Sequence, residues 1–377
     1  MNSTERPHLS VRSPADLVAA VPYLLGFHPA DSVVVIAVRD RRVVFAARGD
    51  LPEPDAEPGP AVRHLAQVVA RQDADSATVV GYGPATRVTS AVDALGEALD
   101  AAGLVVLDVL RVTDGRWWSY LCAEPTCCPA EGTPYDPSAS QVSAAAVFAG
   151  QVALPDRAAL AAQVSPIDGP VRLAMRRATG RARRRLAALT GTLPGSGPGD
   201  DPRPGDDPRP GDDPRPGDDP RPADDPRRGG QARAVRAAGA AAVRAALRRQ
   251  RRGERLDDDE VAWLTVLLTH VPVRDHAWSR TDGRDEDISL WTDVLRRAEP
   301  DLIDAPGTLL AFAAWRAGHG ALAAVALERV LTAHPTYSLA VLLDDVLRRG
   351  VAPSRLDDWP ASAGDGVLRP RRRRPRR

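Results

Sequence analysis

An Asp-Pro-Arg repeat in the middle of the chain constrains the fold more than any other feature. The unit Gly-Asp-Asp-Pro-Arg-Pro occurs four times from Gly199 to Pro222, and a degenerate fifth copy follows at 223–228. Such a stretch has almost no apolar surface to bury, so burial cannot offset the entropy lost on ordering. We therefore expect a disordered, extended linker over 192–230, which divides the 377 residues into two folded parts.

The residues before the linker predict an α/β domain over 1–191. Val33 to Val38 form a continuous apolar run, typical of a strand buried on both faces. Ser13 and Pro14 mark the start of a helix before this run, and Gly26 marks its end. Further strands are expected at 43–51, 78–83 and within 104–121, with helices near 61–72 and 87–102. This order predicts a mixed sheet with flanking helices, followed by three trailing helices.

The residues after the linker, 231–360, predict an all-helical domain built from helical hairpins. Apolar residues recur there with periods of three and four, above all across 306–350. Five residues also match the spacing of a single tetratricopeptide unit, namely Ala311, Gly318, Ala323, Leu327 and Pro335. Tetratricopeptide-like packing is therefore one alternative for this half. The remaining Arg-rich tail, 361–377, is expected to be disordered.

Composition bears on the source and the compartment. All 50 basic residues are Arg and Asn2 is the only Asn, a bias that indicates a GC-rich, actinobacterial genome. No apolar run reaches the roughly 18 residues of a membrane helix, and the first ten residues lack the layout of a signal peptide. Three Cys in such a chain suit a reducing compartment. We expect a cytoplasmic protein without a membrane partner.

Six short motifs are spread over both halves of the chain. They are Val21-Pro22-Tyr23-Leu24-Leu25-Gly26-Phe27-His28-Pro29, Arg48-Gly49-Asp50-Leu51-Pro52, Arg116-Trp117-Trp118-Ser119-Tyr120-Leu121-Cys122, Cys127-Cys128-Pro129, Val273-Arg274-Asp275 and Leu309-Leu310-Ala311-Phe312 with Trp315-Arg316-Ala317-Gly318. In this order they resemble the actinobacterial domain-of-unknown-function 4192 family. The resemblance implies that the repeat is an insertion between the family's two halves. It implies no activity, because the family's name assigns none.

Two segments of the first half could line a ligand pocket. Arg116, Trp118 and Tyr120 lie in the most aromatic stretch of the chain, and Trp118 and Tyr120 would share one face of a strand. His28, Asp31 and Ser32 lie where a helix ends and the buried strand begins, and loops that flank strands often hold ligands in α/β sheets. The alternative is structural: such a His commonly bonds a backbone carbonyl.

Cys122, Cys127 and Cys128 admit four interpretations. They could bind zinc, although adjacent Cys128 would point away unless the loop folds sharply, and the fourth ligand would have to be distant His28 or His64. They could form a disulfide, which a reducing compartment disfavours. They could include a nucleophilic thiol, although no His is near in sequence. We favour the fourth, a structural role in a rigid loop, and predict no cofactor, with zinc as the alternative.

Function is left open among three classes. The sequence lacks GxGxxG, P-loop, His-Glu-x-x-His and GxSxG motifs, so no catalytic residue can be assigned. We favour a protein that binds a small molecule or a protein partner; the alternative is an enzyme, a hydrolase or transferase, that uses the same pocket near His28 and Arg116–Cys128. The third class is a nucleic-acid-associated factor. Arg-rich stretches at 172–190, 231–256 and 369–377 would contact phosphates, although solvated charge is the default interpretation of such stretches.

Overall fold

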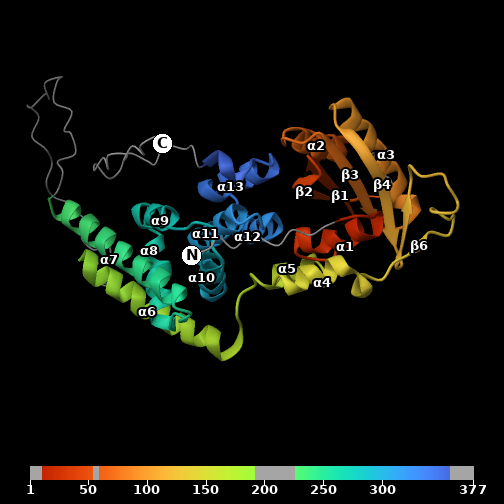
Figure 1. The fold of residues 1–377 in the computed structure, drawn as a ribbon. Helices are drawn as coiled ribbons and strands as arrows, with labels where there is room; N and C mark the ends of the chain where they lie inside the picture. Colours follow the sequence, from red (N-terminus) through yellow and green to blue (C-terminus); the bar gives the residue numbers. More distant parts are fainter. Residues whose placement is uncertain (1–10, 54–58, 192–225, 357–377) are drawn as a thin grey trace, which may run out of the picture.

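The fold is described from a computed structural model that covers residues 11–53, 59–191 and 226–356 (Figure 1). The Asp-Pro-Arg repeat at 199–222 and the predicted tail at 361–377 lie outside the described residues. Within those residues, no helix is long and apolar enough to cross a membrane.

A six-stranded sheet organises the first half, in the order β2-β1-β3-β4-β5-β6. The strands are β1 (Ser32–Arg39), β2 (Arg42–Asp50), β3 (Ser76–Tyr82), β4 (Val105–Thr113), β5 (Arg116–Ser119) and β6 (Thr133–Pro134). β3 and β4 pair in parallel through the crossover helix α3, and the other neighbours pair antiparallel. The mixed sheet predicted from the sequence is confirmed.

Helices cover both faces of this sheet, as the unbroken apolar run of β1 predicts. Val34 and Ile36 point to the core formed with α1 (Pro14–Leu25). Val33 and Val35 point to the opposite core, formed with α2 (Gly59–Ala70) and α3 (Ala85–Ala101). Figure 1 shows α1 on one side of the strands and α2 and α3 on the other.

The ends of α1 follow the capping chemistry of the sequence. The Ser13 hydroxyl accepts a hydrogen bond from the N–H of Asp16 (3.1 Å), and Pro14 occupies the first turn. Gly26 closes the helix with a φ of 83°, and its N–H donates to the carbonyl of Pro22 (2.8 Å). The predicted start and end of this helix are therefore confirmed.

The rest of the described chain is helical. The α-helices are α4 (Gln141–Phe148), α5 (Arg157–Ala162), α6 (Gly169–Thr190), α7 (Pro226–Arg251), α8 (Asp258–Leu268), α9 (Val271–Trp278), α10 (Asp285–Arg297), α11 (Asp304–Arg316), α12 (Gly320–Ala333) and α13 (Ser338–Arg348). Short 3-10 helices lie at Pro137–Ala139, Pro300–Leu302 and Pro353–Leu356. α7 begins at Pro226, so residues 226–230, expected to be extended, are helical; Pro is tolerated in a first turn, and the Ala/Arg-rich segment extends back to it.

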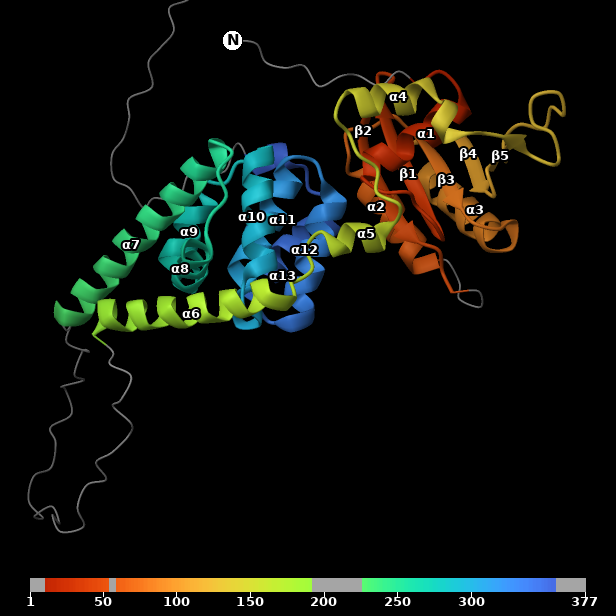
Figure 2. The same cartoon turned by 90° about the horizontal axis from the view of Figure 1, so that it is seen from below.

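A single hydrophobic core unites α5 and α6 with the helices after the linker. Leu160, Met175 and Ala178 belong to the same buried cluster as Trp291 and Leu310. Figure 2 shows α6 running along the helical half, with α7 beside it, and these two helices are in contact. α5 and α6, which precede the linker, thus pack with the second half rather than with the sheet.

The sheet also touches the helical half directly. The side-chain amide of Gln72, just after α2, donates to the carbonyl of Gly350, just after α13 (2.8 Å). On the α5 side, Arg157 forms an ion pair with Glu328 of α12 (2.6 Å). The Gln72 contact therefore joins the α/β half to the helical half, while the Arg157 ion pair secures α5 to α12.

Candidate metal centre

The three cysteine residues lie together in the loop that joins β5 to β6. This loop leaves β5 after Ser119 and returns at Thr133, where β6 pairs with β5. Figure 2 shows it at the end of the molecule that is remote from the helical half. Cys127 is exposed, while Cys122 and Cys128 are half-buried.

Hydrogen bonds fold this loop sharply. The Ser119 hydroxyl donates to the Asp108 carboxylate (2.7 Å) and accepts the N–H of Cys122 (3.1 Å). The carbonyl of Glu124 accepts the N–H groups of Cys127 (3.2 Å) and Cys128 (2.8 Å), which closes a tight turn. The turn brings Cys128 back toward Cys122. Cys128 could join a metal site only if the loop folded sharply in this way.

All three Sγ atoms lie within 4.8 Å of one another. The Sγ atoms of Cys122 and Cys127 are 3.0 Å apart, and those of Cys127 and Cys128 are 3.7 Å apart. Thiolates bound tetrahedrally to zinc at about 2.3 Å would lie about 3.8 Å from one another. The cluster therefore has the dimensions of a three-thiolate metal site and could hold a metal ion.

The three thiols have different acidities. Hydrogen bonds from the Cys127 and Cys128 thiols lower the pKa of Cys122. The same contact with Cys122 raises the pKa of Cys127 and, together with burial, raises that of Cys128 to about 12. Cys122 is thus the most acidic of the three thiols, and a cation in the cluster would favour thiolate formation at the other two.

The cluster supplies three ligands and leaves a fourth position open. Among the described residues, no imidazole or carboxylate joins the three sulfur atoms in a ligand group. His28 precedes β1 and His64 lies on α2; neither belongs to the ligand group, so neither of the histidines considered from the sequence completes the site. A fourth ligand would come from outside this group.

The aromatic residues of β5 hold the loop in place. The Trp118 indole N–H donates to the carbonyl of Ala130 (3.0 Å), and the Arg111 guanidinium stacks 3.5 Å from its ring centre. Gly132, with a φ of 81°, lies so close to this ring that a Cβ would come within 2.3 Å. Arg116 donates to the carbonyl of the same glycine (2.8 Å). Arg116 and Trp118 thus fix the return path of the loop.

Tyr120 and Trp117 pack on opposite faces of the sheet, as the strand alternation predicts. The Tyr120 hydroxyl bonds to the hydroxyl of Thr89 on α3 (2.7 Å). Trp117 is buried in the core beneath α1. Tyr120 therefore contacts a neighbouring helix.

The second predicted segment lies at the same end of the sheet but apart from the first. His28 is exposed and its backbone N–H donates to Leu154 (2.9 Å), while Asp31 pairs with Arg87 (3.0 Å). Ser32 is fully buried and lies in register with Trp117 through β3 and β4. Three strand spacings, about 14 Å in all, separate the two residues.

Buried polar groups lie in a row across the sheet, from Ser32 on β1 to Thr133 on β6. The sequence did not predict that these groups would lie in one row. The Ser32 and Tyr82 hydroxyls, the Trp117 indole N–H and the Thr133 hydroxyl are buried side by side in the register of the sheet, without a partner among the described residues. Burial raises the pKa of Tyr82 well above its usual value. These residues lie at the carboxyl ends of β3 and β4, where α/β sheets bind ligands. These residues are brought together by the pairing register of the strands, which a single sequence does not reveal.

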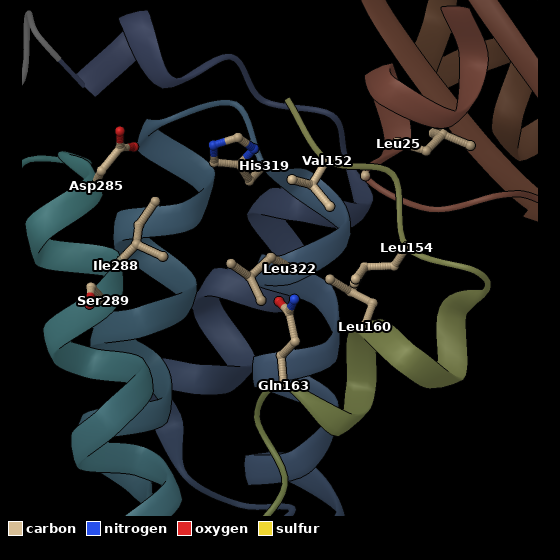
Figure 3. A pocket seen from close by; sticks show the side chains of 11 residues that line it. Leu25, Val152, Leu154, Leu160, Gln163, Asp285, Ile288, Ser289, His319 and Leu322 are labelled. Atoms are coloured by element: carbon tan, nitrogen blue, oxygen red, sulfur yellow. The ribbon is translucent and has the colours of Figure 1, made fainter. Parts of the chain in front are cut away.

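A cavity of about 310 Å³ opens between the two halves (Figure 3). Leu25 and Gly26 of the α1 end line it, two residues before His28, which does not itself contribute. The polar lining comes from other elements: Gln163, Asp285, Ser289 and His319. The segment that leads to His28 thus borders a cavity whose polar groups belong to the helical half.

Several arginine side chains of the Arg-rich helices contact other residues of the same chain. Arg181 and Arg183 of α6 pair with Asp259 and Asp301 of the helical half. Arg185 stacks on Trp263 at 4.1 Å, and Arg249 of α7 pairs with Glu260. These residues of the predicted basic stretches bind acids and an aromatic ring of the same chain.

Comparison with known proteins places both halves in one family. The profile described as "Domain of unknown function (DUF4192)" matches residues 14–207 and 215–354, which include the cysteine loop and the helical half. Searches of curated proteins and of solved structures gave no match. The family resemblance predicted from the motifs is confirmed, and the chain belongs to the DUF4192 family.

Proposed function

We propose that this protein binds one zinc ion through Cys122, Cys127 and Cys128. The observation that carries the proposal is the convergence of three Sγ atoms to within 4.8 Å in one hydrogen-bonded loop. Soft thiolate ligands in a tetrahedral arrangement favour zinc over magnesium or calcium, which prefer oxygen ligands. The lowered pKa of Cys122 favours this residue as the first thiolate.

The open fourth position makes the site a binding site rather than a closed structural centre. Three thiolates and one Zn²⁺ carry a net charge of −1, which makes a bound water less acidic than at a neutral-ligand site. Exchange of the fourth ligand for a thiolate or imidazole from a partner therefore suits the cluster better than water activation. This retains the binding protein favoured by the sequence and gives its partner a stated chemistry.

Two other classes have less support. An enzyme that uses the pocket near His28 would need His28 and Arg116 together, and about 14 Å separates their segments across the sheet. A nucleic-acid partner would need free basic side chains, and Arg181, Arg183 and Arg249 already pair within the chain. A cytoplasmic location would keep the thiols reduced and available for metal.

Metal content measured by mass spectrometry tests the proposal. Full-length protein, purified under reducing conditions without chelator, should carry about one equivalent of zinc, as expected for a single three-thiolate site. Cys122→Ser and Cys128→Ser should each lose most of it, because a hydroxyl is a poor zinc ligand. Glu131→Gln, in the same loop but outside the cluster, is the matched control and should keep its zinc.

Two results would contradict the proposal. One is wild-type protein that is metal-free after growth with zinc and stays so when zinc is added. The other is a Cys122→Ser, Cys127→Ser, Cys128→Ser triple variant that retains the wild-type zinc content. A Cys122–Cys127 disulfide, the competing outcome at this short distance, would appear as the loss of two free thiols in protein denatured without reductant, and reductant would restore them.

A further inference from the structure

The outer face of α7 carries five exposed arginines, which we call the α7 arginine stripe. They are Arg233, Arg236, Arg244, Arg248 and Arg251. Among the residues that the structure describes, none of these five guanidinium groups has an ion-pair or hydrogen-bond partner. The ion pairs described above involve other arginines of the Arg-rich helices, such as Arg249 with Glu260. The positive charge of the stripe is therefore not neutralised by the described part of the chain.

Helical geometry places the five arginines on one side of α7. An α-helix turns by about 100° per residue, so their side chains fall within about 120° of its circumference. At about 1.5 Å per residue, the stripe is about 27 Å long. Figure 2 shows α7 along the outer edge of the helical half, with α9 on its inner side.

The opposite side of α7 is fixed against the helical core. Val235, Val243 and Leu247 are buried in that core. A Cβ on Gly239 would come within 2.3 Å of the Val273 side chain on α9, so the two helices are in close contact. This packing leaves the α7 arginine stripe pointing toward solvent.

The residues around the stripe distinguish between polyanionic partners. Over 231–251 every exposed residue is Arg or Ala, and the whole of α7 contains no acidic and no aromatic residue. Single-stranded nucleic acid is usually bound by aromatic side chains that stack on its bases, and α7 offers none. Helices that bind anionic membranes insert large apolar side chains, and the exposed side of 231–251 has none. Both partners are therefore disfavoured.

Duplex DNA has the charge and the dimensions that complement this face. It carries one negative charge for about every 1.7 Å of its axis, so about 27 Å of duplex presents about 16 phosphates to the stripe. Its major groove is about 12 Å wide and admits an α-helix, whereas that of duplex RNA is too narrow. The small Ala side chains between the arginines leave room for the DNA backbone to approach.

We propose that the α7 arginine stripe binds the phosphate backbone of duplex DNA. Each guanidinium is a planar fork that donates paired hydrogen bonds to phosphate oxygens. The surface belongs to the helical half and is separate from the cysteine loop, so the proposal does not depend on the zinc site.

Fluorescence anisotropy of the full-length protein with a labelled DNA duplex of about 20 base pairs, longer than the stripe, tests the proposal. The logarithm of the binding constant should fall with the logarithm of the salt concentration, with a slope of about −4 to −5 for five neutralised phosphates. The double variant Arg244→Gln, Arg248→Gln should reduce this slope by about two. It should also weaken binding more than about tenfold at about 0.1 M salt.

The double variant Arg63→Gln, Arg71→Gln is the matched control. It removes the same charge from exposed positions on or next to α2, and it should bind DNA like the wild type. Gln and Arg have similar helix propensities, so both double variants should keep their helices. The Arg-rich tail is the same in every protein compared, so a difference between the double variants assigns binding to α7.

Two kinds of result overturn the proposal. One is wild-type protein that does not bind the duplex, or two double variants with equal affinity and equal salt slope. The other is tighter binding to a competitor of equal charge than to the DNA duplex. The competitors are duplex RNA, single-stranded DNA, poly-glutamate and phosphatidylserine vesicles.

Discussion

At the scale of single residues, the three thiols of the cysteine loop differ in their pKa values, although they are chemically identical side chains. Cys122 accepts hydrogen bonds from both neighbours, which lowers its pKa, while Cys128 donates and has a pKa raised to about 12. A thiol is alkylated as its thiolate, so its rate follows the thiolate fraction. The alkylation rate of each cysteine therefore reports how the three thiols are arranged.

In metal-free, reduced protein, iodoacetamide should modify Cys122 first and at the lowest pH. Cys128 should stay unmodified at neutral pH, because its pKa of about 12 keeps it protonated. Cys127→Ala removes a donor to Cys122 and should move the pH of half-maximal Cys122 alkylation upward. Cys127→Ser keeps a donor and should move it less; peptide mass spectrometry gives all these rates. Equal rates at the three thiols would contradict the arrangement.

Residue types alone predicted part of this site. The spacing Cys122-x₄-Cys127-Cys128 indicated a metal site or a structural loop, but it did not distinguish them. The decisive contacts are the hydrogen bonds that two successive amides donate to the Glu124 carbonyl and the packing of Trp118 on Gly132. Such tertiary contacts fix the direction of a side chain, and a spacing pattern carries no information on them.

At the scale of elements, the strongest local signals gave the right boundaries. The Ser13 cap, the Gly26 terminus and the two-faced apolar run of β1 all involve chemistry within a few residues. The order of strands was not predicted, because β1 lies between β2 and β3 only through pairing across the sheet. The position of α11 was not predicted either. Every residue from Ala305 to Trp315 is buried, and the periodicity of apolar residues could indicate a helix but not that it lies at the centre of the helical half.

Close packing of α11 on α12 gives a test at this scale. A Cβ on Gly307 of α11 would come 2.3 Å from Val330 of α12, while one on Gly320 of α12 would meet nothing within 4 Å. Gly307→Ala should lower the free energy of unfolding by about 1–3 kcal/mol through overpacking.

Gly320→Ala, the matched control, should change the free energy of unfolding by no more than about 1 kcal/mol, in the stabilising direction. Chemical denaturation of both variants measures the difference. If Gly307→Ala were as stable as Gly320→Ala, the contact between these two helices would be looser than described.

At the scale of the whole molecule, sequence order and packing do not coincide. The linker separates α6 from α7, yet α6 shares its core with the helices that follow the linker. Composition predicts a linker over 192–230, because Asp, Pro and Arg cannot form a core, and most of that segment lies outside the described residues. It could not show that α5 and α6 pack beyond it, since their apolar faces fit either half equally well.

The ion pair that fixes α6 to the helical half provides a test. Arg172 and Glu299 are each only 13% exposed, so Glu299→Ala leaves a nearly buried charge without its partner. We expect this variant to lose about 3 kcal/mol of unfolding free energy. Glu328→Ala breaks the exposed pair with Arg157 and should cost less than about 1 kcal/mol. Similar losses in the two variants, measured by urea denaturation, would contradict the described packing of α6.

The central claim concerns the cysteine loop, and X-ray absorption at the zinc K edge addresses it directly. The zinc-loaded, full-length protein should show three sulfur ligands at about 2.3 Å and one lighter ligand at about 2.0–2.1 Å. This result would place the metal on Cys122, Cys127 and Cys128 with an open fourth position. A spectrum with only nitrogen and oxygen ligands, or with fewer than three sulfur atoms, would contradict the account.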